Sequence, residues 1–127
     1  MKYFICALDN IQLGIPAEQT AQVIPANHKQ TVLCETENDD VTISLTVLFR
    51  LNDITAPHGI VLKTGSPGKT VLLTPPIDID LEIPEEGIYQ LPESLSPLLK
   101  FFRGVFFSGQ SIILILNPLT LIENVLR

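Results

Sequence analysis

Apolar and polar residues alternate along much of the chain, and this pattern predicts short β-strands. The clearest strand covers residues 77–83, where apolar and acidic residues alternate strictly. Successive side chains of a strand point to opposite faces. We therefore expect the apolar members to face a core: Ile77, Ile79, Leu81 and Ile83. We expect the acidic members to face water or a partner: Asp78, Asp80 and Glu82.

Paired apolar runs on either side of turn residues predict three hairpins. Their strands cover residues 3–8 with 11–15, 59–63 with 69–73, and 104–107 with 111–116. The predicted turns are Asp9-Asn10, residues 65–68 and Ser108-Gly109. A further strand is predicted over residues 41–48. About eight strands at short spacing are typical of an all-β sandwich or barrel.

Helix is predicted in two short segments only. Pro16 can occupy the first turn of a helix that runs to Val23 and is ended by Pro25. Asn117 and Pro118 precede a last short helix over residues 119–126. Residues 95–101 fit either a helical turn or a loop. Residues 26–40 are rich in acidic side chains, and most of this segment is predicted to form a surface loop.

Residues 111–116 have almost no polar face. A strand that is apolar on both sides must be covered on both sides. We expect Ile113 and Ile115 to be buried on one side, and Ile112 and Leu114 on the other. The run therefore favours a strand between two packed β units over a domain with one sheet.

The charge of the chain excludes several classes of partner. Its 127 residues carry 14 acidic and 8 basic side chains, a net charge of -6. Nucleic acids and anionic membranes attract basic surfaces, so we expect neither nucleic-acid binding nor membrane insertion. No apolar run is long enough to span a bilayer. Cys6 and Cys34 are expected to be free thiols in a cytoplasmic protein.

No motif predicts catalysis, a metal or a cofactor. Residues 65–70 end in Gly-Lys-Thr like a phosphate-binding loop, but two residues separate the glycines where the motif needs four. A strand follows them instead of a helix, so we interpret them as a hairpin turn. The acidic segment 35–40 lacks the calcium-loop pattern. His28 and His58 have no acidic or cysteine partner at metal-ligand spacing.

The acidic face of residues 77–83 has two interpretations. Charged outward faces keep edge strands from pairing with other chains. The same charges could instead attract a basic partner.

Taken in order, these elements resemble the CheW-like family of chemotaxis coupling proteins. Residues 3–19 resemble the first hairpin and Ile-Pro step of that family, and residues 59–63 resemble its central strand. Residues 83–94 resemble its linker. The best match is Gly104-Val105-Phe106 with residues 112–118 and Leu121. The order and spacing of the pieces, more than any one piece, carry the resemblance.

The resemblance implies an all-β fold of two small, packed five-stranded β-barrels with short helices, forming a single domain over residues 1–127. It implies a non-catalytic adaptor that bridges a chemoreceptor cytoplasmic tip and the regulatory domain of a histidine kinase. The family's Gly-Leu-x-Val-Asp stretch falls on residues 71–75. We therefore expect partner binding to involve Leu72 and Thr74, together with the acidic residues Asp78, Asp80 and Glu82.

Two signatures of the family are absent. Residues 33–40 contain no Arg-Gly step, and the Gly and Asp of the Gly-Leu-x-Val-Asp stretch are replaced by Val71 and Pro75. These departures favour an alternative function, in which a binding module of the same fold has lost coupling and serves another signalling partner.

Overall fold

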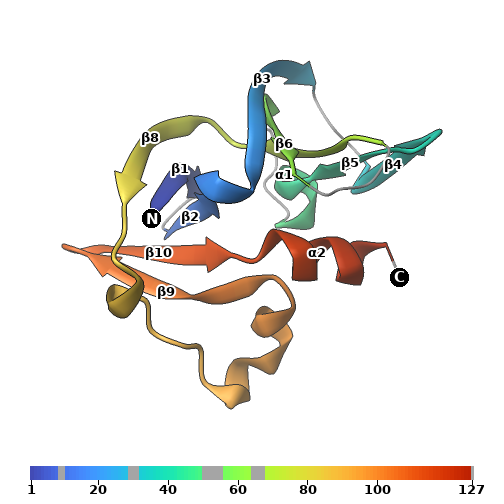
Figure 1. Cartoon of the computed structure of the whole chain (residues 1–127). Helices are drawn as coiled ribbons and strands as arrows, with labels where there is room; N and C mark the ends of the chain where they lie inside the picture. Colours follow the sequence, from blue (N-terminus) through green and yellow to red (C-terminus); the bar gives the residue numbers. More distant parts are fainter. Residues whose placement is uncertain (9–10, 29–31, 50–55, 64–67, 127) are drawn as a thin grey trace. The chain divides into compact units, whose positions relative to one another are not determined.

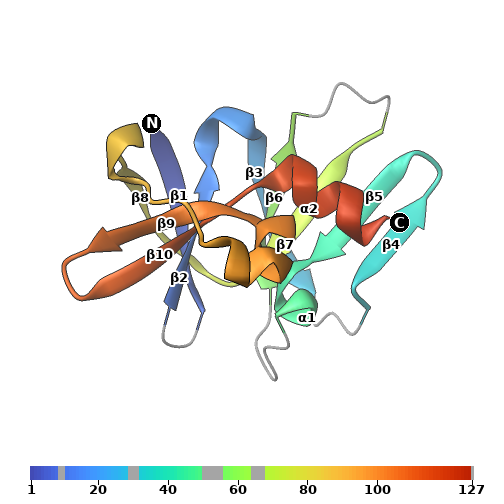
Figure 2. The same cartoon turned by 90° about the horizontal axis from the view of Figure 1, so that it is seen from below.

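The computed structural model describes residues 1–8, 11–28, 32–49, 56–63 and 68–126 (Figures 1 and 2). The chain divides into two compact units. Unit 1 comprises Met1–Glu18 and Asp78–Arg127, and unit 2 comprises Gln19–Ile77. The described residues form two five-stranded sheets and a few short helices. The fold is therefore mostly β, as predicted.

The sheet of unit 1 joins the two ends of the chain. Its strand order is β8-β1-β2-β10-β9. The strands are β1 (Lys2–Leu8), β2 (Ile11–Pro16), β8 (Ile77–Glu82), β9 (Phe102–Ser108) and β10 (Ser111–Leu116). The antiparallel pairs β1–β2 and β9–β10 confirm two predicted hairpins, and β10 runs parallel to β2. The Asp9-Asn10 turn lies outside the described residues, whereas Gly109 adopts a positive φ of 61° in the other turn.

One core cluster of unit 1 lies on one face of this sheet. Its buried members are Tyr3, Ile5, Ile83, Ile113 and Ile115. Gly14 leaves room for this core, because a Cβ there would lie 3.1 Å from Ile115 Cδ1 and 3.2 Å from Ile113 Cγ2. The opposite face also carries buried side chains, because Cys6 and Leu13, which pair across β1 and β2, are fully buried.

The two faces of β10 are buried to different extents. Ile113 and Ile115 are buried, as predicted. Ile112 is 41% exposed and Leu114 is only half-buried, so the prediction that both faces are covered is wrong for Ile112. Ile112 pairs with Phe107 near the tip of the β9–β10 hairpin, beyond the elements that cover the rest of the strand.

The sheet of unit 2 has the order β3-β6-β7-β5-β4. Its strands are β3 (Thr20–His28), β4 (Cys34–Glu37), β5 (Asp40–Ser44), β6 (Ala56–Leu62) and β7 (Thr70–Thr74). The antiparallel pair β6–β7 confirms the third predicted hairpin, and β5 runs parallel to β7. Residues 65–67 of its turn lie outside the described residues.

Three predictions for residues 17–48 are wrong, at least in part. Residues 45–48, predicted as strand, form the helix α1 (Leu45–Leu48), because Ser44 Oγ accepts a hydrogen bond from the Val47 N–H at 3.2 Å and caps the turn. The predicted helix over residues 17–23 is limited to the 3₁₀ turn η1 (Ala17–Gln19), and strand β3 follows. Pairing of β3 with β6 overrides the weak helical pattern. Residues 26–40, predicted to be mostly loop, include the end of β3, all of β4 and the first residue of β5.

The remaining helices belong to unit 1. They are η2 (Glu85–Gly87), η3 (Glu93–Lys100) and α2 (Pro118–Val125). Asn117 caps α2 by accepting a hydrogen bond from the Thr120 N–H at 3.4 Å, which confirms the predicted last helix. Among the described residues, no helix is long and apolar enough to cross a membrane.

Neither sheet closes into a barrel, so the prediction of closed barrels is wrong. Strands β8 and β9 are the edges of the first sheet, and β3 and β4 are the edges of the second. Closure requires the two edge strands of a sheet to pair with each other. Strand β4 has only four residues, and β9 gains only the isolated bridge between Tyr89 and Val105 on its outer side.

Candidate protein-interaction surfaces

The acidic strand is the name we give to β8, the edge strand that carries Asp78, Asp80 and Glu82. All three side chains are exposed, as predicted. Leu81 packs against the core of unit 1, and Ile83 belongs to it. Ile79 is 55% exposed, so its predicted burial is wrong. The core cluster reaches only the end of the edge strand, and Ile79 lies beyond it.

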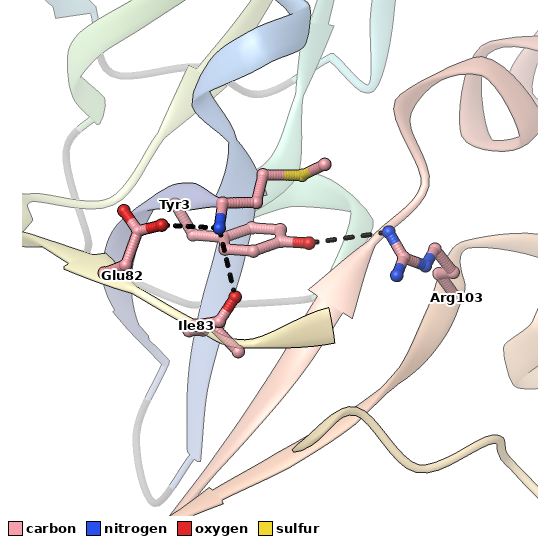
Figure 3. A network of polar contacts seen from close by, with 5 residues as sticks. Tyr3, Glu82, Ile83 and Arg103 are labelled. Atoms are coloured by element: carbon pink, nitrogen blue, oxygen red, sulfur yellow. Dashed lines mark hydrogen bonds and ion pairs between the residues drawn. The ribbon is translucent and has the colours of Figure 1, made fainter. Parts of the chain in front are cut away.

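Two of the three acidic side chains pair with cations of residues 1 and 2, and Figure 3 shows the contact of Glu82. The amino group of Met1 lies 2.6 Å from Glu82 Oε1 and also donates to the Ile83 carbonyl at 3.3 Å. Lys2 Nζ lies 3.3 Å from Asp80 Oδ2. Exposed pairs of this kind contribute about 0–1 kcal/mol. Their main effect is to reduce the negative charge of the acidic strand, so Asp78 is its one carboxylate without an ion pair among the described residues.

A second polar network joins β1, β9 and η2. Arg103 Nη1 donates a hydrogen bond to the Tyr3 hydroxyl at 3.4 Å, and Arg103 also pairs with Glu85 (Figure 3 shows the Tyr3 contact). Burial raises the pKa of the Tyr3 phenol, while the positive charge of Arg103 partly opposes this shift. The network holds the aromatic ring of Tyr3 in the core while giving its hydroxyl a partner.

Leu72 and Thr74, the other predicted partner-binding residues, lie in β7 of unit 2. Both are fully buried. The Thr74 hydroxyl has no hydrogen-bond partner among the described residues. Neither side chain is accessible to a partner in this conformation. Direct contact of a partner with Leu72 or Thr74 therefore stays a prediction, and it would require these side chains to become exposed.

The aromatic patch, which sequence reasoning missed, consists of Tyr89, Phe107 and Ile112 in unit 1. These side chains are 62%, 55% and 41% exposed. The rings of Tyr89 and Phe107 have centroids 5.8 Å apart, and Phe107 pairs across the strands with Ile112. The predicted turn Ser108-Gly109 would place Phe107 opposite Gln110, whereas in the structure Ser108 pairs with Ser111 and Phe107 with Ile112, so the predicted hairpin gave no signal for this patch. Grouped exposed apolar side chains mark interaction sites more often than scattered ones do.

Charge is distributed unevenly between the units. Unit 1 contains nine acidic and four basic residues, a net charge of -5, whereas unit 2 contains five and four, a net charge of -1. The aromatic patch therefore lies on the strongly acidic unit. A surface with apolar anchors and a surrounding negative field is complementary to an apolar surface with a basic rim.

The described residues contain no group of three or more His, Cys, Asp and Glu side chains arranged to hold a metal ion. At the Gly-Lys-Thr segment, the Lys69 N–H donates to Asp40 Oδ1 at 2.8 Å and Thr70 begins β7. The segment thus leads into a strand, as predicted. Cys34 is a half-buried free thiol, and burial together with the nearby charge of Glu35 raises its pKa.

The fold of two five-stranded sheets is CheW-like, as its similarity to a solved structure shows. The structure is similar to the crystal structure of the scaffolding protein TtCheW from Thermoanaerobacter tengcongensis, with a TM-score of 0.68 and 16% sequence identity. The similarity covers 91% of this chain and 83% of that protein. No family model matches the sequence, and no curated protein matches it significantly.

Proposed function

We propose that the chain is a non-catalytic adaptor in bacterial signal transduction, which bridges a chemoreceptor cytoplasmic tip and the regulatory domain of a histidine kinase. The observation that carries this proposal is the likeness to a scaffolding protein over 91% of the chain. The ordered resemblance to coupling proteins from Tyr3 to Leu121 supports it. Fold alone does not determine function, so the proposal depends on the surfaces described above.

In this proposal the aromatic patch anchors the kinase regulatory domain. Aromatic side chains provide much of the binding energy of protein interfaces, because they bury a large area at low conformational cost. The acidic strand and the negative charge of unit 1 accelerate the encounter with a partner that has a basic rim. Binding is transient, as signalling requires.

Phe107→Ser tests this assignment. The substitution removes the centre of the aromatic patch, and we expect it to weaken binding to the purified kinase regulatory domain at least tenfold, measured by calorimetry. Leu119→Ser is the matched control, because Leu119 in α2 is also a 55% exposed apolar residue of unit 1 but is not a member of the aromatic patch. Equal losses in the two variants would reject the aromatic patch as the anchor.

A second candidate function is a binding module of the same fold that serves another signalling partner. The observation that favours it is the absence of an Arg-Gly step from residues 33–40, where the chain has the acidic strand pair β4–β5 instead. The two candidates differ in one measurement. The module would bind neither the chemoreceptor tip nor the kinase under conditions in which a standard coupling protein binds both.

A further inference from the structure

A hollow of about 390 Å³ lies on one face of the sheet of unit 2. Its walls come from both edge strands and from two strands between them, and include Ile24, Ala26, Glu35, Thr42, Val71 and Leu73. Glu35 pairs with Thr42 across β4 and β5, and Thr42 pairs with Val71 across β5 and β7. Cross-strand partners point to the same face of a sheet. The hollow is therefore a concave region on one face of the sheet, and residues of both edge strands, β3 and β4, line it.

Five of the seven residues that line the hollow are apolar, and Gly59 explains how two of them come together. Gly59 of β6 lies between Ile24 of β3 and Leu73 of β7 in the sheet register. A Cβ at this position would lie 3.0 Å from Val71 Cγ1 and 3.2 Å from Ile24 Cγ1. The missing side chain lets Val71 and Ile24 approach each other over β6, and these side chains form part of the apolar wall.

Glu35 and Thr42 are the polar members on the β4–β5 side of this wall. Glu35 is exposed and takes part in none of the ion pairs among the described residues. Its negative charge acts on its surroundings, since it raises the pKa of the neighbouring Cys34 thiol. An apolar wall with a carboxylate at one side is complementary to a long side chain that has an apolar stem and a cationic end.

The edges around the hollow are poorly suited to an added β-strand. Pro25 lies in the edge strand β3 and has no N–H to donate. The other edge strand, β4, has four residues and carries the exposed carboxylates of Glu35 and Glu37. Both are features that prevent edge pairing. An occupant of the hollow is therefore expected to enter with a side chain and not to pair with its backbone.

We propose that this hollow binds an arginine side chain presented by a partner protein. The arginine methylene groups would lie against Ile24, Val71 and Leu73, and the guanidinium would donate to the Glu35 carboxylate, with Thr42 beside it. Arginine suits the site better than lysine, because a guanidinium is less strongly hydrated and donates two parallel hydrogen bonds to one carboxylate. The inference concerns unit 2 alone and does not rest on the coupling function.

Titration of the isotope-labelled full chain by NMR tests the proposal. The probe is arginine blocked at both ends as acetyl-arginine methylamide, and the control probe is the same molecule with citrulline, its uncharged isostere. We expect saturable shifts of the backbone amides of Glu35, Thr42 and Leu73 with a Kd on the order of 1 mM, which citrulline does not produce. Blocked lysine should bind several-fold more weakly.

Two variants make the test specific. Glu35→Gln should weaken arginine binding about tenfold, because it removes the charge without changing the shape. Glu37→Gln removes the same charge from the same exposed strand outside the hollow, and should have little effect. Ala26→Leu should block binding by filling the hollow. Absence of saturable shifts, equal binding of citrulline or lysine, or equal losses in the Glu35 and Glu37 variants would each overturn the proposal.

Discussion

Truncation of Ile113 is expected to destabilise unit 1 strongly. Ile113 is 1% exposed and packs in the core cluster over Gly14. Ile113→Ala removes three carbon atoms, which corresponds to a transfer free energy of about 2.4 kcal/mol at about 0.8 kcal/mol per methylene group. The cavity that remains adds to this loss, so we expect a total decrease in unfolding free energy of about 3–4 kcal/mol.

Ile112→Ala is the matched control, because it makes the same chemical change one residue earlier, where the side chain is 41% exposed. Partial burial and the absence of an enclosed cavity limit its expected cost to about 1 kcal/mol. Both can be measured by urea unfolding followed by tyrosine fluorescence. The chain has two tyrosines and no tryptophan, and both tyrosines belong to unit 1, so the signal reports that unit. A difference below about 1 kcal/mol between the variants would refute the assignment of Ile113 to the core and of Ile112 to the surface.

Three further predictions follow from the polar contacts. Asp78→Asn should slow association with a basic partner at low salt more than Asp80→Asn, because Lys2 already pairs with Asp80; equal rates by stopped flow would refute this. Burial raises the pKa of Tyr3 above 10.0, so the unfolded chain loses the phenol proton first, and unfolding free energy should fall as pH rises above about 10; a loss of the same size in Tyr3→Phe would contradict it. Lys69→Ala should leave stability unchanged, because Asp40 accepts the backbone N–H of Lys69; micromolar ATP binding that disappears in the variant would contradict the hairpin interpretation.

Periodicity predicted the elements whose pattern is local. The paired apolar runs around the turns gave the three hairpins, and Asn117-Pro118 gave the start of α2. The periodicity of apolar residues gave a wrong prediction where pairing with another strand determines the secondary structure. Residues 20–24 fit both a helix and a strand, and only the partner strand β6 settles the choice.

The sequence predicted the candidate surfaces only in part. The alternation of apolar and acidic residues correctly predicted that the three carboxylates of the acidic strand are exposed. It could not show that Ile79 lies beyond the core. It also could not show that the Met1 amino group and Lys2 pair with Glu82 and Asp80. The aromatic patch depends on Tyr89, which lies outside the β9–β10 hairpin and meets β9 through an isolated bridge to Val105. The hollow of unit 2 depends on which strands end at the sheet edges, and no local pattern encodes that order.

Reconstitution of a signalling complex tests the proposed adaptor function most directly. Purified chain would be mixed with receptor cytoplasmic tips and histidine kinase from the same cell, and kinase autophosphorylation would be measured with and without the chain. The account predicts that the chain co-assembles with both and makes autophosphorylation depend on the receptor, and that Phe107→Ser loses this effect while Leu119→Ser retains it. Failure of the unmodified chain to bind either protein, in a mixture where a standard coupling protein binds both, would contradict the account.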